Sequence, residues 1–147
     1  MPRINDDEMG IYDEIKKAAH YQPDAHSSQL ECIVMVEDMD FCIGNGLKYL
    51  YRVGKKPGEA RTKTLAKAEY YFRRKAKRLS ETAHRIVPPV FSQVVTTGLH
   101  RWACSGAPEA SIVQNVLQAY ADPVRGYWEM VKAADRCVEL MQEGEAG

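Results

Sequence analysis

Hydrophobic residues along this chain recur every three or four positions, the spacing of amphipathic helices, and strand-like alternation is nearly absent. The pattern predicts an all-α protein, a compact helical bundle of about five to six helices in which a long basic helix is central. The predicted helices cover residues 29–39, 41–53, 59–84, 90–104, 110–120 and 123–141, and a further short helix is predicted over 11–19.

Polar and special residues between these segments mark the expected helix ends. Ser28 followed three residues later by Glu31 is typical of a capping box, and Asp122 is expected to cap the last helix. Gly54 is expected to end the helix that precedes it, because glycine favours the position after a helix C-terminus. Two consecutive prolines at 88–89 break the chain between two helices.

At 147 residues the chain is expected to form one domain. Residues 1–19 are a polar lead, 20–79 a helical domain, and 80–147 an extension of the same bundle and a candidate oligomerisation element. The apolar helices after the prolines need a partner surface, from which we expect a homo-oligomer. No apolar run is long enough for a membrane span, and the N-terminus lacks the pattern of a secretion signal, so we expect a cytoplasmic protein without membrane contact.

The formal net charge of zero hides a strong segregation of charge. Residues 48–78 carry twelve lysines or arginines against Glu59 and Glu69, a local balance of +10, so the remainder carries −10. A basic segment of this kind attracts phosphates, whether of nucleotides, of nucleic acid or of a lipid surface. The alternative interpretation is a solvated helix face that pairs with acidic neighbours.

The densest group of polar residues lies in segment 41–53 and the loop that follows it. Asn45, Lys48 and Arg52 stand at i, i+3 and i+7, so an amide, an ammonium and a guanidinium line one helix face, which could hold a phosphate chain. Lys55 and Lys56, on a glycine-bounded loop, are candidates for a lid over such a ligand. A solvated basic face is again the alternative.

Acidic residues gather on the predicted helix before this one. Glu31 and Asp38 are seven residues apart and are expected to share a helix face, where two carboxylates can bracket a hydrated Mg²⁺. Alternatively, Glu31 is only a capping-box residue and Asp38 a salt-bridge partner. His20 is a candidate general acid or base. The chain has no P-loop, GxGxxG, HExxH or GxSxG motif, so a nucleotide would be bound without the usual phosphate-binding loop.

Four short elements follow one another in the first half of the chain. They are His20-Tyr21-Gln22, Glu31-Cys32-Ile33, the run from Phe41 to Lys56 with its Gly-Asn, Lys-Tyr, Arg and Gly-Lys-Lys pieces, and the run from Leu65 to Tyr71. Together they resemble a family of small phage-encoded domains that are nucleotide kinase-like and include a deoxynucleoside monophosphate kinase without a P-loop. The resemblance covers about residues 20–74, half of the chain.

Together with the patterns above, the resemblance implies a set of site residues. Catalytic roles fall to His20, Lys48 and Arg52, substrate and phosphate binding to Asn45, Tyr49, Lys55, Lys56, Lys67 and Tyr70, and metal binding to Glu31 and Asp38. The sequence departs from the family at two positions. An acidic residue usually stands where Thr64 is found, and often another where Val34 is found, so a carboxylate that holds a metal is weakened or supplied elsewhere.

The expected function is a Mg²⁺-dependent nucleotide kinase that transfers a phosphoryl group from a nucleoside triphosphate to a deoxynucleoside monophosphate. A phage-encoded protein of this kind would act in the host cytoplasm. One alternative is an all-α nucleoside triphosphate pyrophosphohydrolase, although the expected ExxE and ExxD pairs are not present. The other alternative is a non-enzymatic phage accessory protein whose basic helix binds nucleic acid or a host partner. This alternative is less favoured, because a protein that binds only a phosphate backbone does not require the Gly-Asn and Gly-Lys-Lys elements.

Overall fold

The computed structural model describes residues 28–53, 55, 58–81 and 84–146, and every regular element in these ranges is helical. The α-helices are α2 (Cys32–Val36), α3 (Phe41–Tyr51), α4 (Arg61–Glu81), α5 (Gln93–Ala103), α6 (Ala110–Ala121) and α7 (Gly126–Ala146), with a 3₁₀ turn, η2 (Pro123–Arg125), before α7. The predicted all-α helical bundle is confirmed. The predicted lead and the short helix over 11–19 lie outside the described residues.

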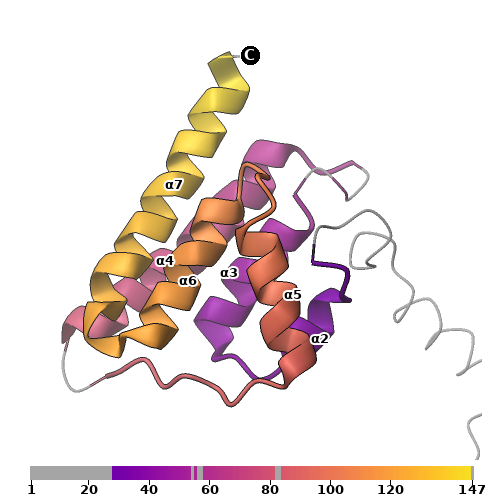
Figure 1. Ribbon diagram of the computed structural model, residues 1–147. Helices are drawn as coiled ribbons and strands as arrows, with labels where there is room; N and C mark the ends of the chain where they lie inside the picture. Colours follow the sequence, from indigo (N-terminus) through magenta and orange to yellow (C-terminus); the bar gives the residue numbers. More distant parts are fainter. Residues whose placement is uncertain (1–27, 54, 56–57, 82–83, 147) are drawn as a thin grey trace, which may run out of the picture.

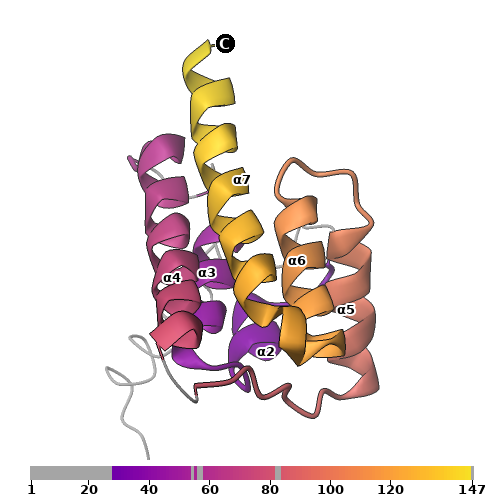
Figure 2. The same ribbon diagram turned by 90° about the vertical axis from the view of Figure 1, so that its left-hand side faces the viewer.

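The long basic helix α4 lies at one side of the described helices (Figure 2), so the expected central position of this helix is wrong. It packs against α3 on one side and along most of α7 on another, and α6 in turn packs on α7. Helix α5 contacts both α6 and α2, so α2 shares one core with the helices that follow the two prolines (Figure 1). Figure 2 shows α4 and α7 side by side, with α5 and α6 on the other side of α7.

Helix α2 is much shorter than the predicted segment 29–39. Gln29 has a positive φ of 60°, and Glu31 is extended and occupies the N-cap position without a side-chain capping bond. The Ser28 hydroxyl accepts instead from the backbone N–H of Leu30 at 3.3 Å. The predicted capping box is therefore wrong, because the backbone turns at Gln29 where a helix would have to begin.

The other helices begin and end within a few residues of the predicted segments. Asp40 ends the preceding segment, because its side chain caps α3 by accepting from the N–H of Ile43 at 3.0 Å and its backbone is extended. Ser92 caps α5 in the same way through the N–H of Val95. Asp122 precedes η2 without a side-chain capping bond, so that predicted cap is wrong.

The apolar helices of the second half find much of their partner surface within the chain. Leu99, Trp102 and Val113 are at most 1% exposed and belong to the same core as the buried residues of α3 and α4. Trp128 stays largely exposed near the start of α7. The homo-oligomer expected from these helices remains a prediction. In the parts of the chain that the structure describes, no helix is both long enough and apolar enough to cross a membrane.

Candidate functional site

The candidate site lies where α3 and α4 pack closely against each other. A Cβ atom on Gly46 of α3 would lie 2.6 Å from Cζ of Phe72, whose ring is fully buried beneath α3. Only glycine at this position lets the two helices approach so closely without moving a core ring. The close approach brings Lys48, Tyr49 and their neighbours on α3 next to residues of α4.

Three cationic side chains surround the ring of Tyr49. The Arg52 guanidinium carbon lies 4.5 Å from the ring centroid, and the ammonium nitrogens of Lys48 and Lys67 lie at 4.7 and 5.5 Å. Lys48 lies on α3, Arg52 is the C-cap residue directly after the last turn of α3, and Lys67 lies on α4. These distances are those of cation–π contacts, in which the negative face of the ring attracts positive charge.

Aromatic rings extend this cationic group along the same two helices. Tyr71 stacks on Tyr49, with ring centroids 5.9 Å apart and planes 11° apart. Phe41 and Tyr70 each meet Tyr71 edge to face, and both are largely exposed. Because Tyr71 already covers Tyr49, the exposed rings of Phe41 and Tyr70 are the ones that can offer a stacking surface to a ligand.

The Glu59 carboxylate, just before α4, joins residues of both helices. Its Oε1 accepts hydrogen bonds from Arg52 at 3.1 Å, Thr64 at 3.0 Å and Lys67 at 3.1 Å, and Oε2 accepts from Arg52 at 3.0 Å. The Arg52 and Glu59 side chains are 7% and 8% exposed, whereas that of Lys67 is 35% exposed. Arg52, predicted to touch a phosphate directly, therefore lies behind Glu59 and Tyr49.

Burial acts to raise the pKa of Glu59, but the hydrogen bonds from Lys67, Thr64 and Arg52 outweigh it and hold the pKa at about 2, below the ordinary 4.5. A carboxyl group with a lowered pKa in the folded state stabilises the fold above its unfolded-state pKa. This contribution is lost as the pH falls from about 4.5 toward 2.

Replacing Glu59 by glutamine removes the charge but keeps an oxygen for the same donors. We expect the wild-type protein to lose more stability than Glu59→Gln between pH 5 and pH 2.5, because only the wild type must protonate this carboxylate on unfolding. Urea unfolding midpoints at the two pH values measure the difference. Parallel losses in both proteins would show that Glu59 is not held in its ionised form by these donors.

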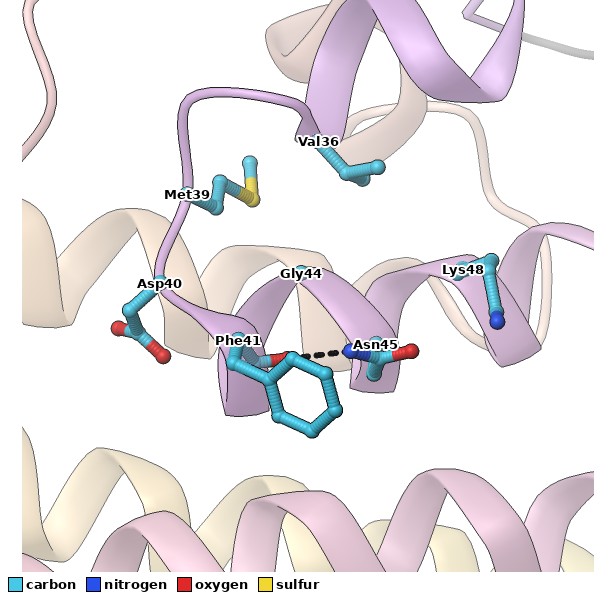
Figure 3. Close-up of a pocket in the computed structure, with 7 residues that line it drawn as sticks. All are labelled: Val36, Met39, Asp40, Phe41, Gly44, Asn45 and Lys48. Atoms are coloured by element: carbon cyan, nitrogen blue, oxygen red, sulfur yellow. Dashed lines mark hydrogen bonds between the residues drawn. The ribbon is translucent and has the colours of Figure 1, made fainter.

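A shallow depression of about 190 Å³ lies beside the cationic group, between α3 and the segment that leads into it. Figure 3 shows Asp40 near one end and Lys48 near the other, with Asn45 between them. The Asn45 amide nitrogen donates to the Phe41 carbonyl at 2.7 Å, which leaves its amide oxygen as an acceptor (Figure 3). Asn45 and Lys48 thus line the same hollow, in agreement with their predicted common face.

The predicted metal ligands do not share a helix face. Glu31 precedes α2 and Asp38 follows it, since α2 covers only Cys32–Val36. That part of the expectation is wrong, because the shared face required a helix running from 29 to 39. Among the described residues, no group of three or more His, Cys, Asp and Glu side chains lies close enough to hold a metal ion.

The remaining predicted site residues fall in or near the loop and the lead. Lys55 folds back over the ring of Tyr51, 4.4 Å from its centroid, rather than over the cationic group. Burial lowers the pKa of Lys55, and the nearby Glu109 opposes that change. His20 and Lys56 lie outside the described residues.

Lys75, a basic residue of the segment 48–78, stabilises the fold instead of facing a ligand. Lys75 is only 4% exposed, and its ammonium lies 3.2 Å from Asp40 Oδ2 and 2.9 Å from His84 Nε2. Burial lowers the pKa of His84, and the positive charges of Lys75 and Arg78 lower it further. The pair with Asp40 ties α4 to the start of α3, so this charge is not available to a ligand.

The sequence reasoning missed two members of the site. Tyr71 was not singled out, although it lies next to Tyr70 and stacks on Tyr49. Glu59 was counted only as a charge in the basic segment. The sequence nonetheless contains a signal for Glu59, because the resemblance implies an acidic residue at the position where Thr64 stands. The structure places the Glu59 carboxylate 3.0 Å from the Thr64 hydroxyl, so another residue supplies an acidic group at this point.

One comparison with known proteins gives a match. A family model described as a protein of unknown function, DUF3310, matches residues 15–73. That stretch contains α2, α3 and the first part of α4, and with them the cationic group around Tyr49. No curated protein and no solved structure matches the chain.

Proposed function

We propose that this protein binds a deoxynucleoside monophosphate on the α3–α4 face and phosphorylates it from a nucleoside triphosphate. The observation that carries the proposal is the group of three cations around Tyr49, with exposed aromatic rings beside it. A nucleotide presents a charged phosphate and a flat base a few ångströms apart. The face offers lysine ammoniums for the first and the rings of Phe41 and Tyr70 for the second.

Phosphoryl transfer depends mainly on positioning and on neutralising charge. Lys48 and Lys67 are the partly exposed cations of the group, so they are the residues that an incoming phosphate would meet first. Arg52 is buried and contacts Tyr49 and Glu59, so it is not open to a ligand while Glu59 pairs with it. The resemblance to small phage-encoded nucleotide kinase-like domains supports the choice of phosphoryl transfer.

Mg²⁺ would accompany the phosphates of the triphosphate, because this ion keeps several waters and is commonly held by substrate phosphates plus one or two carboxylates. Glu31 and Asp38 stand beyond opposite ends of α2, so they do not fit the shared-face metal site expected from the sequence. No step of the proposed reaction is therefore assigned to a metal held by these two residues.

Ligand-induced thermal stabilisation tests the proposal. A ligand that binds only the native state at one hundred times its Kd adds about 2.7 kcal/mol of stability, which raises Tm by roughly 5–15 °C in a domain of this size. We expect such a rise with at least one deoxynucleoside monophosphate, and transfer of the γ-phosphate of ATP to that nucleotide when Mg²⁺ is added.

The same screen includes single-stranded oligonucleotides without terminal phosphates. A rise in Tm with these oligonucleotides and none with mononucleotides would contradict the proposal and favour the accessory-protein interpretation. If a nucleotide binds but the γ-phosphate of ATP is not transferred to it, the proposed binding site is supported and the proposed kinase activity is contradicted.

A further inference from the structure

Arg52, Thr64 and Lys67 converge on one point between α3 and α4, and that point is occupied by the Glu59 carboxylate. Four hydrogen bonds of 3.0–3.1 Å reach its two oxygens from these three side chains. A guanidinium, a hydroxyl and an ammonium that converge in this way form the kind of donor set that binds phosphate oxygens in proteins.

We infer that these three side chains form an oxyanion site that Glu59 fills when no ligand is bound, and that the phosphate of a nucleotide takes by displacing Glu59. This inference deepens the proposed function and rests on it for the nucleotide. The phosphate subsite itself can be tested with inorganic phosphate alone.

Exposure indicates how a ligand would enter this site. The Arg52 and Glu59 side chains are almost fully buried, but about a third of the Lys67 side chain is open to solvent. An incoming phosphate therefore meets Lys67 first and competes with Glu59 for its ammonium. Lys48, the other partly exposed cation near the Tyr49 ring, adds to the attraction for the incoming charge.

The position of Glu59 in the chain makes displacement feasible. Glu59 precedes α4, which begins at Arg61, so its side chain can leave the donors without unwinding a helix. The neighbouring Gly58 has a φ of +76° and open space around the position of a Cβ atom. Titration cannot vacate the site near neutral pH, since Glu59 stays ionised down to a pKa of about 2. Displacement by a stronger anion is the route that remains.

A phosphate monoester is suited to this exchange. Near pH 7.5 it carries close to two negative charges, because its second pKa is about 6, whereas Glu59 carries one. The cations near Tyr49 therefore attract the phosphate more strongly than the carboxylate. The same phosphate oxygens would accept the hydrogen bonds that Arg52, Thr64 and Lys67 now donate to Glu59.

Glu59→Gln tests the inference through the sign of its effect. Glutamine competes weakly for Lys67, so we expect affinity for inorganic phosphate and for deoxynucleoside monophosphates to rise about five- to tenfold in calorimetry at pH 7.5. Affinity for the matching deoxynucleoside, which has no phosphate, should stay within twofold. Glu69→Gln is the control, because it makes the same change in net charge on a residue that pairs with Arg73 instead.

A second variant separates competition from positioning. If Glu59 competes for Lys67, the change Lys67→Met should cost more affinity in the Glu59→Gln background than in the wild type. If Glu59 instead holds Lys67 in place for the ligand, Lys67→Met should cost less in that background. Glu59→Asp is the variant to use if Glu59→Gln fails to fold. It keeps the charge but shortens the side chain by one methylene, so it should raise phosphate affinity, by less than the gain expected for Glu59→Gln.

Three results would overturn the inference: unchanged phosphate affinity in Glu59→Gln, a loss of phosphate affinity in Glu59→Gln, or an equal gain in Glu69→Gln. If nucleotides bind but Glu59→Gln brings no gain, the occupied oxyanion site is wrong and the proposed function stands. If inorganic phosphate binds with the expected pattern and no nucleotide binds, the oxyanion site stands and the proposed function fails.

Discussion

Replacing Phe72 with alanine is expected to destabilise the protein by about 3–5 kcal/mol, the range for removing a fully buried phenylalanine from a core. The Phe72 ring is 0% exposed and fills the space beneath Gly46, where α3 and α4 come closest. Its loss leaves a cavity under the helix pair that carries the cationic group. Urea unfolding followed by circular dichroism measures the change in the free energy of unfolding.

Tyr70→Ala is the matched control for this prediction. It removes an aromatic ring from the same helix, two residues away, but Tyr70 is 63% exposed and contacts Tyr71 edge to face. We expect a loss of about 1 kcal/mol or less, in line with one exposed aromatic pair. Equal losses for Phe72→Ala and Tyr70→Ala would contradict the packing of α4 against α3 described above.

The helical fold could be predicted from the sequence because its signals are local. The three- and four-residue spacing of apolar positions fixes which face of each helix is buried, and Leu65, Ala68, Phe72 and Ala76 are buried on α4 as that spacing predicts. Helix ends were predicted less well where two local signals competed. The extended backbone of Asp40, which caps α3, and the turn at Gln29 confine α2 to five residues.

The candidate site could be predicted only in part. The common face of Asn45, Lys48 and Arg52 follows from helix periodicity, and the structure has Asn45 and Lys48 in one hollow and Lys48 and Arg52 around one ring. The role of Glu59 depends on where the residues just before α4 lie relative to the end of α3, which no spacing in the sequence encodes. The shared face of Glu31 and Asp38 failed because it assumed a helix twice as long as α2.

Charge alone did not distinguish functional from structural basic residues. Lys75 belongs to the same basic segment as Lys67, yet it is buried against Asp40 and His84. Arg73 pairs with Glu69 on its own helix and with Asp135 on α7. These pairings use part of the local excess of positive charge to hold the bundle together, and they leave Lys48 and Lys67 as partly exposed cations at the aromatic face.

Lys48→Met is expected to weaken binding of a deoxynucleoside monophosphate about ten- to a hundredfold. The reason is that a hydrogen bond to a charged group contributes roughly 1.5–3 kcal/mol, and methionine keeps the length of the side chain without its charge. Lys77→Met is the control, because Lys77 is on the same basic segment but is exposed and pairs only loosely with Glu81 at 3.9 Å. It should change the affinity by less than about twofold, through a screened field alone.

Calorimetric titration of these two variants and the wild type, at low and at physiological salt, tests the nucleotide site on the α3–α4 face most directly. The site predicts a large loss for Lys48→Met that persists at physiological salt, with Lys77→Met close to the wild type. Equal losses for both variants that shrink together as salt rises would contradict it, because they would show that the nucleotide meets only a diffuse basic surface.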